Sequence, residues 1–336
     1  MSVSVFLKQS CETCKLVAPV LKSFLEQNSA EIFCQDGPSF VQDLAVSEDL
    51  GLRRSWEASI EIVPTLIRFG KDGKELERIE GWNSEEWAEF LQVDIPETML
   101  KYKPGCGSET LAPGMPEKLA AKFGDEEIKS RDISIGEHED EIEACYSRGW
   151  SDGLPVVPPT KERVLRMLSG TARHAQDIVG VVPPNLVQCS VEKIAINAVL
   201  AGCLPQYLPV VIAAVEAALQ DEFCMHGLLA TTYFSGPLVI VNGPIARAIG
   251  MNSEGNVLGQ GNRANSTIGR ALQLVIRNIG GGKPQEVDRS AFGTPGKIGF
   301  CFAEDEAGSY WQSLAQERGI ESGCSSVTLF AADGVQ

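Results

Sequence analysis

The sequence has few basic residues and no uninterrupted apolar segment of membrane length. Lysine and arginine number 29 against 45 aspartate and glutamate residues, which leaves a formal net charge of −16. Nucleic-acid-binding and polybasic membrane-surface proteins need a positive surface, so we expect neither a nucleic-acid nor a membrane partner. The most apolar stretch is residues 194–219. Pro205, Pro209 and Glu216 interrupt it, and we expect a buried helical hairpin there instead of a transmembrane segment.

Histidine is also scarce, with 3 residues, whereas cysteine is frequent, with 10. The opening residues 1–7 lack the basic and long apolar regions of a secretory signal, so we expect a cytoplasmic location. In that reducing compartment, cysteines serve redox chemistry, metal binding or core packing more often than structural disulfides. The length of 336 residues, with 43% hydrophobic and 22% charged residues, indicates a globular chain of two domains.

The pattern of apolar residues divides the chain into three segments. Residues 1–92 read as an α/β domain, because short β-rich runs at 3–7 and 31–34 flank a helical periodicity, and Ser84 is predicted to cap a last helix. Residues 93–145 are rich in proline, glycine and acidic residues and are interpreted as a linker and acidic entry segment. Residues 146–336 are predicted to form a larger α/β domain, in which Thr160 and Ser190 cap helices.

Two cysteines one helical turn apart, in Cys11-Glu12-Thr13-Cys14, lie where the first predicted strand gives way to a helix. The free N–H groups and positive dipole of a helix N-terminus favour the thiolate of Cys11. Cys14 is placed to attack a mixed disulfide at Cys11 and so resolve it. The same spacing fits half of a zinc site, so the motif alone leaves redox and metal-binding functions open.

The context of this motif resembles the thioredoxin fold over residues 1–92. A strand precedes the motif, a helix follows it, and Val63-Pro64-Thr65 arrives about fifty residues later, where the family has its cis-proline strand. The resemblance implies that Cys11 is the nucleophile, that Cys14 is the resolving thiol, and that Pro64 is the cis residue facing the sulfurs. In that family the cis bond presents a backbone edge to the client chain. The resemblance also implies a thiol reductant or disulfide partner.

Several positions depart from the common thioredoxin pattern, among them Ser10, where many members have tryptophan. Val5 stands where the common thioredoxins have a buried aspartate that helps proton transfer to the resolving cysteine, and Glu12-Thr13 replaces Gly-Pro. A carboxylate beside a thiolate disfavours ionisation, so we expect Glu12 to raise the pKa of Cys11 somewhat. We therefore expect a dedicated partner, such as the attached domain, and not a general disulfide reductase. The alternative is a degenerate domain used only for packing or docking.

In the second domain, a glycine-rich turn between Gly259 and Asn262 opens a strongly amphipathic helix. Backbone N–H groups at such a start can face an anion, and arginine can hold a carboxylate or phosphate bidentately. We predict a site for a small anionic substrate, lined by Asn242, Asn262, Arg263, Asn265 and Arg270. A surface helix whose arginines pair with carboxylates is the alternative. The spacing matches neither a P-loop nor a dinucleotide fingerprint, which leaves a nucleotide site unsupported.

Two cysteines and a histidine of the second domain are further candidates for chemistry. Cys203 lies at the break between two helical segments, where a thiol can be exposed. Cys224 precedes His226 by two residues, so this pair is either a nucleophile with its base or two metal ligands. The sequence encodes no clear cofactor beyond a possible metal at Cys224 and His226. For each cysteine the alternative is an ordinary buried residue.

Residues 146–332 resemble a bacterial protein family, on the segments Arg148 to Thr160 and Gly261 to Arg270. That resemblance implies one module and supplies no activity. The sequence as a whole predicts a thiol–disulfide redox enzyme, in which Cys11 and Cys14 deliver electrons or sulfur to the anionic substrate. The receiving thiol would be Cys203, or Cys224 with His226.

Two other functions fit the same residues. One is a cysteine- or metal-dependent lyase or transferase whose thiol the thioredoxin-like domain regenerates. The other is a redox-regulated binding or scaffold protein, in which oxidation of Cys11 and Cys14 changes the contact between domains. The apolar segment 194–219 also makes a homo-oligomer a reasonable expectation.

Overall fold

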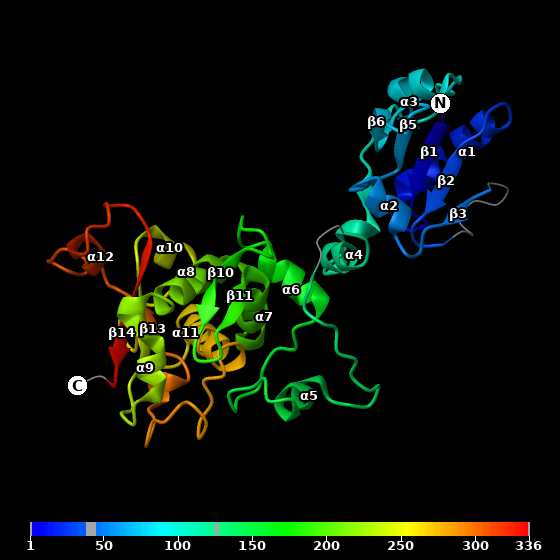
Figure 1. Ribbon diagram of the computed structural model, residues 1–336. Coiled ribbons are helices and arrows are strands. Elements are labelled where there is room, and N and C mark those ends of the chain that lie inside the picture. The colour runs from blue at the N-terminus through cyan, green and yellow to red at the C-terminus, as the bar shows by residue number, and fades with distance from the viewer. Residues whose placement is uncertain (1, 38–44, 125–127, 335–336) are drawn as a thin grey trace. The chain divides into compact units, whose positions relative to one another are not determined.

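The computed structural model describes residues 2–37, 45–124 and 128–334 and has a mixed α/β structure (Figure 1). The α/β class predicted from the sequence is confirmed at this level. The chain divides into two compact units, residues 1–126 and 127–336. The first unit therefore extends beyond residue 92, where composition places the end of the first domain. Within the described residues, no helix combines the length and the apolar character needed to cross a bilayer.

The first unit contains a five-stranded sheet in the order β3-β2-β1-β5-β6. β1 (Ser2–Leu7) is central and runs parallel to β2 (Glu31–Cys34), which in turn runs parallel to β3 (Ser47–Glu48). On the other side, β5 (Thr65–Phe69) is antiparallel to β1 and to β6 (Glu75–Glu80). The predicted strands at 3–7 and 31–34 are confirmed. Their β-branched and aromatic residues favour strands that are buried within a sheet.

Helix α1 (Glu12–Leu25) follows β1 and turns one apolar face to the core. Its buried residues recur every three or four positions, as in an amphipathic helix: Thr13, Cys14, Val17, Val20, Leu21 and Phe24. The unit also contains α2 (Arg53–Glu57) and α3 (Ser84–Leu91). The predicted cap at Ser84 is wrong by one residue: Ser84 is the first residue of α3, and Asn83 is the N-cap, because its side chain accepts the N–H groups of Glu85 and Glu86.

The chain after α3 stays within the first unit and pairs with its earlier strands. β8 (Tyr102–Lys103) pairs with β7 (Trp82–Asn83), and β9 (Cys106–Gly107) pairs with β4 (Ile62–Val63). A 3₁₀ helix (Glu109–Leu111) and α4 (Met115–Phe123) follow. Strands of two residues leave no hydrophobic periodicity in the sequence, which is why this segment reads as a linker.

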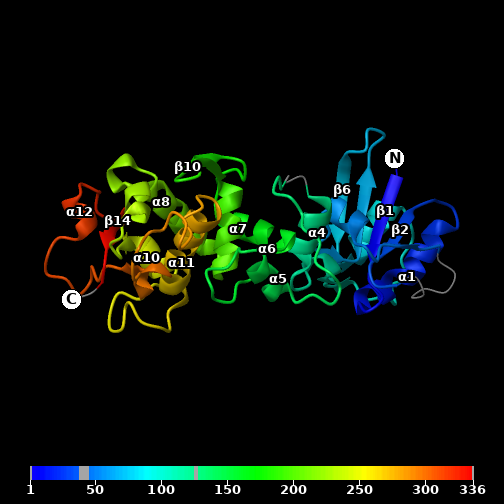
Figure 2. The same cartoon turned by 60° about the horizontal axis from the view of Figure 1, so that its bottom comes forward.

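The second unit is built on a three-stranded sheet. β12 (Gly236–Asn242) lies between the parallel strand β13 (Cys301–Ala303) and the antiparallel strand β14 (Ser326–Ala332). α11 (Arg263–Asn278) packs against α7 (Val191–Ala201) and α8 (Leu208–Ala218) (Figure 2). The remaining elements are α5 (Glu141–Ser147), α6 (Lys161–Leu168), β10 (Ile178–Val182), β11 (Val187–Ser190), α9 (Met225–Ala230), α10 (Pro244–Ala248), α12 (Leu314–Glu317) and 3₁₀ helices at Pro205–Tyr207, Asp221–Phe223 and Pro295–Lys297.

Two predicted helix caps of this unit are confirmed. The Thr160 side chain accepts the N–H of Arg163 at the start of α6. The Ser190 side chain accepts the N–H of Lys193 at the start of α7. Each hydroxyl satisfies one of the N–H groups that a helix N-terminus leaves without an intrahelical partner.

Leu21 and Leu76 give a matched test of the first core. Leu21 lies on the buried face of α1 and is fully buried, whereas Leu76 in β6 is 56% exposed. We expect Leu21→Ala to lower the free energy of unfolding by about 2–5 kcal/mol, because it leaves a cavity. Leu76→Ala deletes the same atoms on the surface and should change it by less than about 0.5 kcal/mol. Urea denaturation of the full chain measures both, and similar losses would contradict this core.

Candidate active site

Cys11 is the N-cap residue of α1 and has no solvent-exposed surface. Its Sγ accepts a hydrogen bond from the backbone N–H of Cys14 at 3.4 Å. The first N–H groups of a helix lack intrahelical partners and carry partial positive charge, so an anionic sulfur is a favourable cap. The helix start thus places Cys11 where its ionised form is stabilised.

The pKa of Cys11 is lowered to about 5. The main cause is the hydrogen bond from the Cys14 thiol; the Cys106 thiol and the N–H groups of Cys14 and Thr13 add to it, against the cost of burial. Cys11 is therefore a thiolate at neutral pH. The expectation that Glu12 makes this thiol less acidic is wrong. The exposed Glu12 carboxylate pairs with Lys15, whose Nζ lies 2.6 Å away.

Cys14 lies one turn further along α1 and is also fully buried. Its Sγ accepts the backbone N–H of Lys8 at 3.4 Å. Burial, together with the hydrogen bond to Cys11, raises the pKa of Cys14 far above that of an ordinary thiol. At neutral pH the two cysteines of the motif are therefore in opposite states, a thiolate at Cys11 and a thiol at Cys14.

The predicted cis proline is adjacent to the residue that contacts Cys11. The Val63–Pro64 peptide bond is cis. The carbonyl oxygen of Val63 lies 3.6 Å from Cys11 Sγ. Pro64 separates β4 from β5, so the backbone beside the sulfur is the end of β4.

A third cysteine, Cys106, belongs to the same cluster. β9 pairs with β4 so that Cys106 is opposite Val63, the residue whose carbonyl contacts Cys11 Sγ. Burial, and then hydrogen bonding to Cys11, raises the pKa of Cys106, so it is a thiol at neutral pH. Cys106 lies within residues 93–145, which the sequence indicates as a linker. Its pairing joins segments about forty residues apart, and no local pattern signals it.

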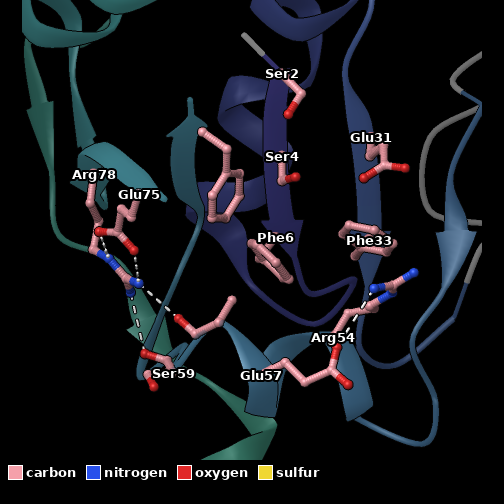
Figure 3. A pocket seen from close by; sticks show the side chains of 12 residues that line it. Ser2, Ser4, Phe6, Glu31, Phe33, Arg54, Glu57, Ser59, Glu75 and Arg78 are labelled. Carbon is pink, nitrogen blue, oxygen red and sulfur yellow. Dashed lines mark hydrogen bonds and ion pairs between the residues drawn. The ribbon is translucent and has the colours of Figure 1, made fainter. Parts of the chain in front are cut away.

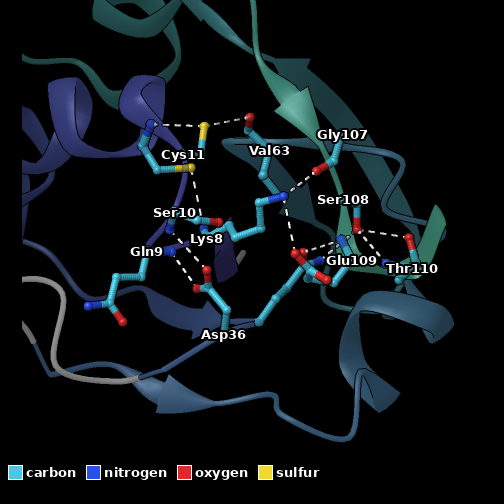
Figure 4. A network of polar contacts seen from close by, with 12 residues as sticks. Lys8, Gln9, Ser10, Cys11, Asp36, Val63, Gly107, Ser108, Glu109 and Thr110 are labelled. Atoms are coloured by element: carbon cyan, nitrogen blue, oxygen red, sulfur yellow. Dashed lines mark hydrogen bonds and ion pairs between the residues drawn. The ribbon is translucent and has the colours of Figure 1, made fainter. Parts of the chain in front are cut away.

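Asp36 and Lys8 hold the main chain that leads into the motif (Figure 4). The backbone N–H groups of Gln9 and Ser10 donate to the Asp36 carboxylate, the latter at 2.9 Å. Burial opposes ionisation of Asp36, but these N–H groups outweigh it and keep its pKa below the usual range. The Lys8 side chain reaches the other way, to the carbonyl oxygen of Gly107 at 2.9 Å. The loop before Cys11 is therefore fixed on both sides.

A cavity of about 430 Å³ opens on one face of the first sheet (Figure 3). Ser4 and Phe6 of β1 line it. The intervening residue Val5 faces the opposite side, because side chains alternate along a strand, and packs in the same core as Cys11 and Cys14. Among the described residues that line the cavity, none is a cysteine, so it is separate from the thiol cluster.

In the second unit, the two arginines predicted to bind an anion make contacts within the protein. Arg270 Nε and Nη2 each lie 2.8 Å from an oxygen of Asp152, and both side chains are largely buried. Burial opposes ionisation of Asp152, but Arg270 outweighs it and keeps the pKa of that carboxyl below its usual range. Arg263 is exposed, and its Nε donates to the carbonyl oxygen of Gly202 at 2.9 Å. The pairing of Arg270 matches the alternative of arginines held by carboxylates.

The three asparagines predicted to line that site are engaged in contacts within the protein; Asn265 donates from its side chain to the carbonyl oxygen of Asn252 at 2.9 Å. Asn262 is the N-cap of α11 and accepts the N–H of Asn265 at 3.0 Å. Asn242 ends β12, is fully buried, and donates to the carboxylates of Glu304 and Glu306 at 2.6 Å each. Two carboxylates at Asn242 carry the charge opposite to that of the arginines, so its surroundings disfavour an anion.

The candidate nucleophiles of the second unit differ in exposure. Cys203 is buried with its Sγ 3.4 Å from the carbonyl oxygen of Thr267, and burial raises its pKa to about 12. Cys224 and His226 are exposed at the start of α9. The Cys224 Sγ lies over Gly227, 2.7 Å from where a Cβ would be. Among the described residues, no group of three or more His, Cys, Asp or Glu side chains is arranged to hold a metal ion.

No family model, curated protein or solved structure matches the chain. The resemblance of residues 1–92 to the thioredoxin fold, and that of residues 146–332 to a bacterial family, therefore stay predictions. The chemistry of the site follows from its own geometry, which brings three sulfurs together where β1, α1, β4 and β9 meet.

The low pKa of Cys11 can be measured directly. In the reduced protein, the ultraviolet absorbance of its thiolate should disappear as the pH falls through about 5, because protonation of Cys11 removes the anion. The difference titration between the wild type and Cys11→Ser isolates this step, and Cys224→Ser, which removes an exposed cysteine, should leave it in place. A midpoint at the ordinary thiol value of about 8.5 would contradict the assignment.

Proposed function

We propose that the first unit catalyses thiol–disulfide exchange, with Cys11 as the nucleophile and Cys14 as the resolving thiol. The observation that carries the proposal is the placement of a thiolate and a neutral thiol one helical turn apart. Attack on a disulfide requires a thiolate, and resolution of the mixed disulfide requires a second sulfur within reach. The site supplies both from a single motif.

We also propose that this unit is a thioredoxin-like domain. The support is the sheet order β3-β2-β1-β5-β6, in which the central strand leads through Cys11 into α1 and Pro64 precedes β5. In the second unit we propose a buried helical hairpin formed by α7 and α8. The support there is the 3₁₀ turn Pro205–Tyr207 between two helices whose residues are mostly buried.

The exchange runs in two balanced steps. The Cys11 thiolate attacks one sulfur of a partner disulfide; a Cys11–partner bond forms, the partner's S–S bond breaks, and the leaving thiolate takes a proton from solvent. Cys14 then loses its proton and attacks Cys11 Sγ, which releases the second partner thiolate and leaves a Cys11–Cys14 disulfide. Two electrons have passed to the partner, and an external thiol reductant restores the two thiols.

The first step itself prepares Cys14 for the second. In the reduced protein, the pKa of Cys14 is raised by burial and also by the negative charge and hydrogen bonding of Cys11. Once Cys11 is part of a mixed disulfide, that charge is gone, and burial and Cys106 still oppose ionisation of Cys14. Cys14 therefore stays protonated until a partner has formed the mixed disulfide with Cys11. This control of its ionisation does not need the buried aspartate that common thioredoxins have at the position of Val5.

We propose that the second unit supplies the dedicated partner, either a receiving thiol or a small anionic substrate. A receiving thiol has to be accessible. Cys224 is exposed, whereas Cys203 is buried and its pKa is raised to about 12. For an anionic substrate, Arg263 is the better candidate of the two arginines, because it is exposed and Arg270 is paired with Asp152.

Reaction of the reduced full chain with bis(2-hydroxyethyl) disulfide tests the exchange. Trypsin cleavage after Lys8 and Lys15 places both cysteines of the motif in residues 9–15. We expect an internal disulfide in that peptide by mass spectrometry. Cys11→Ser should react at least ~100-fold more slowly there, because the nucleophile is lost.

Cys324→Ser is the matched control. It removes an exposed cysteine of the second unit and should leave the reaction of residues 9–15 unchanged. A peptide 9–15 that stays unmodified in the wild type, or that reacts equally well in Cys11→Ser, would show that the proposed exchange does not occur.

A further inference from the structure

Residues 102–109, which we call the strap, hold Cys106 beside Cys11. In the antiparallel pairing of β9 with β4, Cys106 is opposite Val63 and Gly107 is opposite Ile62. The carbonyl oxygen of Val63 is the group that lies 3.6 Å from Cys11 Sγ. Cys11 and Cys106 therefore both lie against one residue of β4.

The strap is fastened to the elements that carry the site. Three hydrogen bonds join it to α1, to the loop before α1 and to the residue preceding β4: Thr13 Oγ1 to the Pro104 carbonyl oxygen at 2.7 Å, Lys8 Nζ to the Gly107 carbonyl oxygen at 2.9 Å, and the Ser108 N–H to the Glu61 carbonyl oxygen at 2.9 Å. Figure 4 shows the Lys8 side chain reaching Gly107. Movement of the strap therefore breaks contacts of the nucleophile's own helix and loop.

Gly105 permits this close approach. A Cβ at position 105 would lie 2.8 Å from the Val63 carbonyl oxygen and 2.3 Å from Ile62 Cγ2, closer than real Cβ contacts. Glycine is the residue type used where two backbones must come this near. The absence of a side chain at Gly105 thus allows the backbone next to Cys106 to pack closely against β4.

The strap occupies the position that an extended partner would take. Peptides commonly bind by adding a strand to a free backbone edge, and the edge of β4 is paired with β9. Cys11 and Cys14 accordingly have no exposed surface. The chain places its own segment at this edge, and Cys106 belongs to that segment.

We propose that Cys106 is a third exchanging thiol, which competes with Cys14 for the sulfur of Cys11 and forms a Cys11–Cys106 disulfide. This inference rests on the proposed exchange at Cys11. The Cys106 thiolate attacks Cys11 Sγ in the Cys11–Cys14 disulfide; the Cys11–Cys106 bond forms, the Cys11–Cys14 bond breaks, and Cys14 takes up a proton in place of the one lost by Cys106. One disulfide replaces another, so the step consumes neither oxidant nor reductant.

The charges around Cys106 fit both of its states. In the reduced protein, burial and the neighbouring Cys11 thiolate raise the pKa of Cys106, so it stays protonated. A disulfide at Cys11 removes that negative charge, while Lys8 continues to favour the ionised form of Cys106. The thiol that stabilises the nucleophile in one state is thus the attacking group in the other.

Peptide mapping of Cys14→Ser tests this role. Trypsin places Cys11 in residues 9–15 and Cys106 in residues 102–118, because the Lys103–Pro104 bond resists cleavage. After reaction of the reduced full chain with bis(2-hydroxyethyl) disulfide, we expect a disulfide that links the two peptides and no adduct on Cys11. Cys14→Ala serves as a second variant that puts no hydroxyl in the buried site.

Two double variants separate the outcomes. Cys14→Ser/Cys106→Ser should keep the adduct on Cys11, whereas Cys14→Ser/Cys34→Ser, which removes another buried cysteine of the unit, should still form the link. A stable adduct on Cys11 in both Cys14→Ser and Cys14→Ala overturns the role of Cys106 and leaves exchange at Cys11 standing. If Cys11 reacts in no form of the protein, the proposed function and this inference both fail.

The cover provided by the strap is tested by alkylation of Cys11 with iodoacetamide. Thr13→Val removes the hydrogen bond to Pro104 with little change of shape, and we expect roughly fivefold faster alkylation, because the strap opens more often. Thr267→Val removes a bond of the same 2.7 Å length within α11 and should not change the rate. Equal rates in Thr13→Val and the wild type would show that the strap does not limit access.

Discussion

The site depends on how a negative sulfur is kept inside the protein. A buried anion is costly unless several donors converge on it, and the Cys11 thiolate has the N-terminus of α1 and the thiols of Cys14 and Cys106. These donors come from different parts of the first unit. The N–H groups belong to the start of α1, Cys14 lies one turn further along that helix, and Cys106 lies in the segment that follows α3 and pairs with β4. The reactive state therefore exists only when the whole first unit is assembled.

Stabilisation of the nucleophile and access to it are opposed in this arrangement. The strap brings Cys106 opposite Val63, beside Cys11, and both sulfurs of the motif are buried. A site left open would lose one donor and hold a less acidic thiol. The covered form is thus the one with the more stable thiolate, and under the proposed exchange a partner would have to displace part of the strap.

Local features of the fold and site could be predicted from the sequence, whereas long-range pairing could not. The start of α1 at Cys11 and the caps at Thr160 and Ser190 are set by neighbouring residues, and they were correct. The contact of β9 with β4 and the pairing of Arg270 with Asp152 join distant segments without a local signal. The effect of Glu12 on Cys11 is a different case. Lys15 lies one turn away on the same helix face, so the spacing in the sequence already indicates that Lys15 pairs with the Glu12 carboxylate.

If the proposed exchange takes place, the two hydrogen bonds that anchor the strap would also select reactants by size. A compact thiol or disulfide needs room only around the Cys106 side chain. A polypeptide needs the whole edge of β4, and so it has to displace β9 and the bonds from Thr13 and Lys8. A small reductant would then need only a small displacement of the strap, whereas a polypeptide client would need a large one. The strap would thereby control the relative rates at which the two reach Cys11.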